Sequence, residues 1–142
     1  MILVDANLLI YAVNSDAPRH ARVRAWLEKE LSSETEVGLA WVVVLAFLRV
    51  ITKPGILAHP LAPEAALRIV DGWFQQPYVV PVSPGPNHWP LLRQLVSVTG
   101  TAGNLTTDAH LAAMALERGC TLYSCDYDFR RYPNIMHADP LA

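Results

Sequence analysis

Residues 107–128 read TDAHLAAMALERGCTLYSCDYD, a helix-like segment joined to a strand-like segment through one glycine. We expect a helix over Thr107–Arg118, because its threonine is a favourable N-cap and Asp108 suits the positive end of the helix dipole. Gly119 is a residue type that commonly ends a helix, and the run that follows predicts a strand over Thr121–Ser124. A helix that leads directly into a strand is the building unit of a parallel sheet with helices on its faces.

The rest of the chain repeats this alternation. Ile2-Leu3-Val4 is a short, wholly apolar run, as expected of a strand that is buried on both faces. Hydrophobic spacing and proline or glycine stops predict further helices at about residues 19–31, 42–52, 63–74 and 88–99, and further strands at 37–40, 78–82 and 135–137. The length of 142 residues is typical of one domain, which we place at residues 1–142. The sequence therefore predicts an α/β fold with a short parallel central sheet flanked by helices.

The composition excludes several classes of protein. With 52% hydrophobic and 17% charged residues the chain is neither disordered nor a coiled coil, and its formal net charge of −2 gives no overall positive field for nucleic acid. Two cysteines do not make a disulfide framework. The apolar N-terminus lacks a positively charged segment and is interrupted by Asp5, and no apolar run reaches the length of a membrane span. We therefore expect a cytoplasmic protein that makes no membrane contact and whose RNA contacts use local arginines.

Four aspartates stand where the predicted strands end. Asp5 directly follows the first strand, Asp126 and Asp128 follow the strand that ends at Ser124, and Asp108 opens the helix that leads into that strand. In a parallel sheet the carboxyl ends of the strands share one edge, and such a helix begins at the same edge. Carboxylates gathered there repel one another, and a hard divalent cation such as Mg²⁺ relieves the repulsion. The placement therefore predicts a metal site suited to phosphodiester hydrolysis by metal-activated water.

Each aspartate also has a purely structural explanation when it is taken alone. Asp5 stands where a turn or helix cap is common, and Asp108 stands where a negative charge favours the helix dipole. Asp126 and Asp128 stand where they would cap a short turn over Phe129–Tyr132. The joint placement of the four acids at one edge is what favours the metal site.

Other polar residues accompany the acids along the sequence. Asn7 either holds the carboxylate of Asp5 by a hydrogen bond or caps the first helix, and both interpretations stay open. Asn104 and Thr106 are expected in a loop, with a secondary role in orienting an acid. Two basic residues that directly follow the acid pair are candidates for contacts with RNA phosphates: Arg130 and Arg131.

Three motifs occur along the chain: VDAN at residues 4–7, TDAHLAA at residues 107–113 and SCDYDF at residues 124–129. In this order they resemble the PIN domain, and in particular the VapC toxins of bacterial toxin–antitoxin pairs. Three further blocks fit a VapC subgroup: WVVVLAFLRV at residues 41–50, HPL at 59–61 and DPL at 139–141. The resemblance covers essentially the whole chain.

The resemblance implies an α/β/α sandwich and a Mg²⁺- or Mn²⁺-dependent endoribonuclease that cuts structured RNA, commonly tRNA or ribosomal RNA. It also implies a homodimer and a cognate VapB antitoxin that blocks the toxin. Carried over by position, Asp5 and Asp108 are the principal metal ligands and Asp126 is the third. Asp128 is either a further ligand or the holder of a metal-bound water.

The chain departs from the family pattern in the helix expected at residues 42–52. Many VapC proteins carry a glutamate there, in a segment like LAEL, whereas this chain reads LAFL with Phe47 at the position of the acid. No acid lies from Val37 to Pro63, so the number of metal ions, one or two, stays open. We expect Phe47 to pack in the core or in a dimer face.

Two other functions stay open at this point. A catalytically weak PIN module that acts by binding RNA or an antitoxin is favoured by the missing glutamate. An aspartate-nucleophile phosphatase of the haloacid dehalogenase type would also place an aspartate such as Asp5 after an apolar strand. Such phosphatases usually carry a second aspartate two residues later, where this chain has Asn7.

Overall fold

A computed structural model describes residues 1–99 and 106–142 of the chain. Within these ranges, five strands form one central sheet in the spatial order β3-β2-β1-β4-β5, and every neighbouring pair is parallel. The strands are β1 (Ile2–Val4), β2 (Val37–Ala40), β3 (Val79–Val82), β4 (Thr121–Tyr123) and β5 (His137–Ala138). The predicted short parallel sheet is therefore confirmed.

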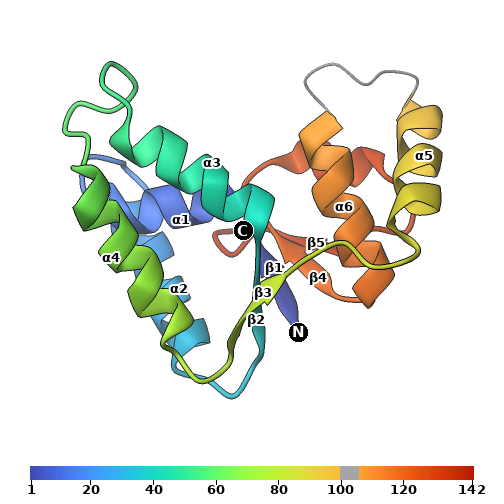
Figure 1. Ribbon diagram of the computed structural model, residues 1–142, viewed down its shortest axis with the longest axis horizontal. Helices are drawn as coiled ribbons and strands as arrows, with labels where there is room; N and C mark the ends of the chain where they lie inside the picture. Colours follow the sequence, from blue (N-terminus) through green and yellow to red (C-terminus); the bar gives the residue numbers. More distant parts are fainter. Residues whose placement is uncertain (100–105) are drawn as a thin grey trace.

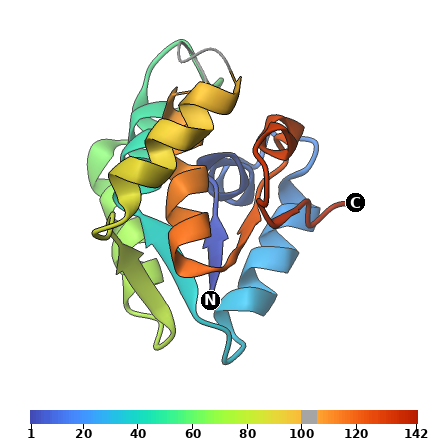
Figure 2. The ribbon, with the colours of Figure 1, turned by 90° about the vertical axis from the view of Figure 1, so that its right-hand side faces the viewer.

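Helices cover both faces of the sheet, as Figure 1 shows. One layer holds α1 (Ala6–Val13), α2 (His20–Leu31), α3 (Trp41–Thr52) and α4 (Pro63–Phe74). The other layer holds α5 (His88–Thr99) and α6 (Thr106–Arg118), and Figure 2 looks onto the sheet from their side. A short 3-10 helix, η2 (Tyr127–Arg131), follows β4. Across the described ranges, none of the helices combines the length and the apolar character needed to cross a membrane.

Helix α1 is the element that the sequence analysis did not predict. Asp5 has an extended backbone, and its side chain accepts a hydrogen bond from the amide of Ala6, so it caps α1. The helix reads ANLLIYAV, and it packs against α2 and α3. Because nearly every position is apolar, the sequence shows no polar face that would reveal the helical period. Most of the other predicted boundaries lie within one residue of the observed ones, while β5 begins two residues later than expected.

The hydrophobic core draws on both helical layers, with buried residues from α3 and α4 on one side of the sheet and from α6 on the other. Leu3 and Val4 of β1 are fully buried, as predicted for a strand covered on both faces. On α3, Phe47 is 0% exposed and meets Trp73 of α4 edge-on, with 4.9 Å between ring centroids. Edge-to-face pairs of this kind are favourable beyond the area that they bury. Phe47 therefore belongs to the hydrophobic core, one of the two positions expected for it.

Candidate active site

The carboxyl ends of β1 and β4 bring residues from the two ends of the chain together. Val4 of β1 is in register with Tyr123 of β4, and the amide of Asp5 donates to the carbonyl of Tyr123 at 2.9 Å. Asp126 lies three residues beyond the end of β4, and Asp108 lies in the first turn of α6. The parallel topology thus gathers the predicted acids at one edge of the sheet.

Ser124 organises this edge, although the sequence analysis did not single it out. It is 0% exposed, and its hydroxyl donates to Oδ2 of Asp5 at 2.7 Å. The same hydroxyl oxygen accepts from the amide of Asp126 at 3.0 Å and from Nδ2 of Asn7 at 3.1 Å. One buried serine therefore fixes Asp5 and the start of the loop that carries Asp126. The only sequence signal was a polar residue at the end of an apolar strand, next to the acids.

The hydrogen bonds of Asn7 differ from both interpretations that the sequence left open. The cap of α1 is Asp5, and the side chain of Asn7 bonds to Ser124 rather than directly to Asp5. Its Oδ1 also accepts from the amide of Cys125 at 3.5 Å. Asn7 thus supports the Asp5 carboxylate through Ser124.

Asp126 and Asp128 serve the turn that follows β4 as well as the acidic edge. Oδ1 of Asp126 accepts from the amide of Asp128 at 2.9 Å and so caps η2. Asp128 pairs with Arg131 across 3.3 Å. The guanidinium of Arg130 lies 4.4 Å from the centroid of the Tyr127 ring. The two arginines proposed for phosphate contacts therefore already have partners within the chain.

The remaining predicted supporting residues lie close to the start of α6. Asn104 lies outside the described residues. Thr106 is the first residue of α6 and lines a shallow pocket together with Trp89 and Arg93 of α5.

The electrostatics of the cluster reflect crowded negative charge. The pKa of Asp108 is raised to about 6, chiefly by burial. The neighbouring charges that raise it further are, in order, those of Asp126, Asp5 and Asp128. Burial also raises the pKa of Asp5, although hydrogen bonds from Ser124 and the Ala6 amide oppose the shift. These carboxylates are close enough to repel one another, and a bound cation would relieve that repulsion.

The donor chemistry fits a hard divalent cation, because carboxylate oxygens are the ligands that Mg²⁺ prefers. In the parts of the chain that the structure describes, however, no three His, Cys, Asp or Glu side chains are grouped as a ready-made metal site. Two of the carboxylates are held by bonds within the protein, through Ser124 for Asp5 and through Arg131 for Asp128. The edge therefore offers oxygens of the right chemistry, which in this structure are held by bonds within the protein.

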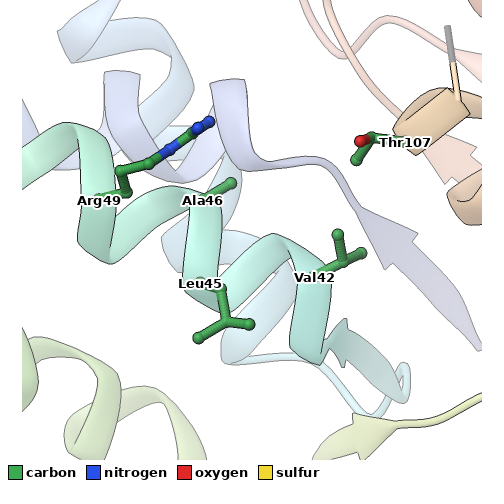
Figure 3. Close-up of a pocket in the computed structure, with 5 residues that line it drawn as sticks. All are labelled: Val42, Leu45, Ala46, Arg49 and Thr107. Atoms are coloured by element: carbon green, nitrogen blue, oxygen red, sulfur yellow. The ribbon is translucent and has the colours of Figure 1, made fainter. Parts of the chain in front are cut away.

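A pocket of about 280 Å³ lies between α3 and the start of α6 (Figure 3). Its described lining comes from one face of α3 and from the start of α6: Val42, Leu45, Ala46, Arg49 and Thr107. Thr107 directly precedes Asp108, so the pocket reaches the first turn of α6, which carries one of the four acids. None of the described lining residues is acidic, and Phe47 packs into the core instead of lining the pocket. The sequence does not reveal that Arg49 and Thr107 line a pocket, because the directions of their side chains depend on how α3 and α6 pack.

Comparisons of the sequence with protein families and with individual proteins agree with each other. The PIN domain family matches residues 2–135. The ribonuclease VapC37 of Mycobacterium tuberculosis is 42% identical over 142 residues, which covers 100% of this chain and 99% of that protein. The ribonuclease VapC33 of the same species is 38% identical over 141 residues, with 99% of each chain covered.

Solved structures resemble the fold. VapBC2 from Rickettsia felis, bound to a DNA fragment from its promoter, gives a TM-score of 0.73 at 16% identity, with 98% of each chain covered. VapC20 of Mycobacterium tuberculosis, described as a toxin that cleaves the sarcin–ricin loop, gives a TM-score of 0.66 at 16% identity and covers 92% of this chain and 93% of that one. At such identities the likeness concerns the fold alone.

Proposed function

The chain belongs to the VapC family of PIN-domain proteins, and on that premise we propose that it is the ribonuclease toxin of a toxin–antitoxin pair. Its substrate would be structured RNA, tRNA or ribosomal RNA, and its cofactor Mg²⁺ or Mn²⁺. The observation that carries the proposal is the set of aspartates at the carboxyl edge of β1 and β4, where mutual repulsion helps to raise the pKa of Asp108 to about 6. Membership of the PIN family also argues against the phosphatase of the haloacid dehalogenase type.

The aspartates divide the work in this proposal. Asp5, Asp108 and Asp126 would hold the cation, which when bound stabilises negative charge on the phosphate oxygens and makes water a better nucleophile. Ser124 keeps Asp5 in place through its 2.7 Å hydrogen bond. Asp128, which is more exposed, would orient the water that attacks the phosphorus in line with the leaving oxygen.

The test compares the wild type with Asp5→Asn and Asp108→Asn, which remove a charge but keep the side-chain shape. Each protein is induced in bacteria while growth is followed and new RNA 5′ ends are mapped across the transcriptome. We expect growth arrest and discrete new ends with the wild type, and neither with the two variants. The matched control is Asp71→Asn, an exposed aspartate on α4, which should behave as the wild type.

Two results would count against this function. If the Asp5→Asn protein produced the same RNA ends, the aspartate cluster would not be the catalytic site. If both proteins arrested growth without new ends, the chain would act by binding, as in the alternative of a catalytically weak PIN module. The absence of a carboxylate among the described residues of the α3 wall is the observation that favours that alternative.

We also propose a cognate VapB-like antitoxin as partner and a homodimer as the assembled form. On α3, Val44 and Phe47 are buried in the core, whereas Trp41 remains 48% exposed and is available for antitoxin docking. Leu45, one turn further along α3, is 65% exposed. Trp41→Ala is therefore expected to weaken neutralisation of the toxin by a co-expressed antitoxin. Unchanged neutralisation would count against this docking face.

A further inference from the structure

The pocket beside the acids carries a positive charge on the wall that α3 provides. Arg49 is exposed, and among the described residues no hydrogen bond or ion pair engages its guanidinium. The nearby arginines are occupied, because Arg131 pairs with Asp128 and Arg130 lies over Tyr127. Within the described part of the chain, Arg49 is thus an unpaired cation in a pocket that the first turn of α6 also lines.

Packing fixes the direction from which Arg49 enters the pocket. Val42, Ala46 and Arg49 are spaced four and three residues apart, so they share one face of α3. The buried side of the helix, which includes Phe47 and Ile51, prevents it from rotating. In Figure 3 the Arg49 side chain extends past Ala46 along the pocket, and the hydroxyl of Thr107 lies on the opposite wall.

The charges around the aspartates show that Arg49 does not neutralise them. The groups that shift the pKa of Asp108 are the other three aspartates, and Arg49 is not among them. Nor is it among the groups that shift the pKa of Asp5. The charge of Arg49 is therefore not spent on the aspartates.

We propose that Arg49 binds a backbone phosphate of the RNA substrate at the entrance to the acidic cluster. This inference rests on the proposed ribonuclease function and names a positioning residue for it. A guanidinium can donate two parallel hydrogen bonds to one phosphate, and it offsets the repulsion that an RNA strand meets near the aspartates. The apolar neighbours Val42 and Leu45 suit contact with a ribose or base.

The size of the pocket agrees with a single nucleotide unit. Its volume of about 280 Å³ lies at the lower end of small-ligand pockets, roughly 300 Å³. Phosphate contacts position a nucleic acid without reading its sequence. Arg49 therefore sets where the strand lies, and its loss affects RNAs of different sequence alike.

The test measures RNA binding by the full chain in EDTA, so that no cutting takes place. The probe is a fluorescently labelled single-stranded RNA of mixed sequence, titrated from about 50 to about 200 mM KCl. Arg49→Gln is compared with the wild type and with Arg68→Gln, which removes the same charge from an exposed position on α4. Arg49→Lys keeps the charge but cannot form the two parallel bonds.

We expect Arg49→Gln to weaken binding roughly tenfold, as for loss of a hydrogen bond to a charged group. The slope of log affinity against log salt should become shallower by about 0.7, the value for one phosphate contact on a single strand. Arg49→Lys should keep the wild-type slope with part of the affinity lost, and Arg68→Gln should match the wild type. Unfolding midpoints confirm that each variant is folded.

The proposal is overturned if Arg49→Gln keeps the wild-type salt slope and RNA affinity. It is also overturned if Arg49→Gln and Arg68→Gln lose RNA affinity equally, or if the wild type binds no RNA. The proposed ribonuclease function fails separately, when induced wild type creates no RNA ends that depend on Asp5. Normal RNA binding by Arg49→Gln together with Asp5-dependent cutting would remove the role of Arg49 and leave the ribonuclease standing.

Discussion

Replacing Asp108 with asparagine is expected to stabilise the metal-free protein at neutral pH while abolishing its proposed activity. The pKa of this carboxyl is raised from 3.8 to about 6, by burial first and then by three neighbouring aspartates. A folded state that holds a proton more tightly than the unfolded chain loses stability as the proton leaves. The contribution of the protonated Asp108 to the free energy of unfolding is therefore fully present below about pH 3.8 and is lost as the pH rises through about 6.

The size of the effect follows from that interval. At 1.36 kcal/mol per pH unit, the interval from 3.8 to about 6 corresponds to about 3 kcal/mol. Asp108 is only half-buried, so solvent screening reduces this to about 1 kcal/mol. For a chain of this length, about 1 kcal/mol moves the thermal midpoint by roughly 3 °C. Asparagine stays uncharged at every pH and so avoids the loss.

Urea unfolding in EDTA at about pH 4 and about pH 7.5 measures this directly. The free energy of unfolding of Asp108→Asn minus that of the wild type should grow by about 1 kcal/mol between the two pH values. Asp71→Asn, on the exposed face of α4, should show the same small difference at both. A difference for Asp108→Asn that does not change with pH, or that shrinks towards neutrality, would refute the assignment of repulsion to this cluster.

Three further results are expected from the same site. Mg²⁺ at 100 times its dissociation constant should raise the free energy of unfolding of the wild type by about 2.7 kcal/mol, and an equal rise in Asp5→Asn, measured by thermal denaturation, would exclude Asp5 as a ligand. Ser124→Ala removes a hydrogen bond to Asp5, so it should lower the free energy of unfolding in urea by about 1–3 kcal/mol. The same change should weaken Mg²⁺ binding about 10- to 100-fold in calorimetric titration. Ser97→Ala, at an exposed position, should change neither quantity. Ala46 lines the pocket, so Ala46→Glu should leave the protein folded and tighten Mg²⁺ binding. Phe47→Glu places a charge in the core and should prevent folding. A folded Phe47→Glu protein, measured by circular dichroism, would contradict the core position of Phe47.

The strands and the meeting of the acids could be predicted because both depend on local pattern and on topology. Ile2–Val4 is short and wholly apolar, as a buried strand requires. Gly119 marks the end of the last long helix, although that helix begins at Thr106 and Thr107 is therefore inside it rather than its N-cap. Once the sheet is parallel, Asp5 and Asp126 must emerge at the same edge. Topology alone thus located the cluster.

The features that escaped prediction depend on packing between distant segments. Helix α1 is hidden by its uniformly apolar sequence. The hydrogen bond between Ser124 and Asp5 joins residues 119 positions apart, so no local pattern announces it. Whether Phe47, Ala46 or Arg49 faces the acids is decided by the rotation of α3, which the contact between Phe47 and Trp73 fixes. Sequence spacing gives the relative faces of a helix but not which of them meets the site.

The pairing of β1 with β4 has a consequence for the timing of activity during synthesis. Ser124 is translated 119 residues after Asp5, and β1 gains its β4 neighbour only then. A nascent chain that ends before β4 lacks half of the acidic edge, however well its helices have formed. A chain terminated or trimmed before residue 121 would therefore lack Ser124, Asp126 and Asp128, so the acidic edge can be completed only after these residues have been made.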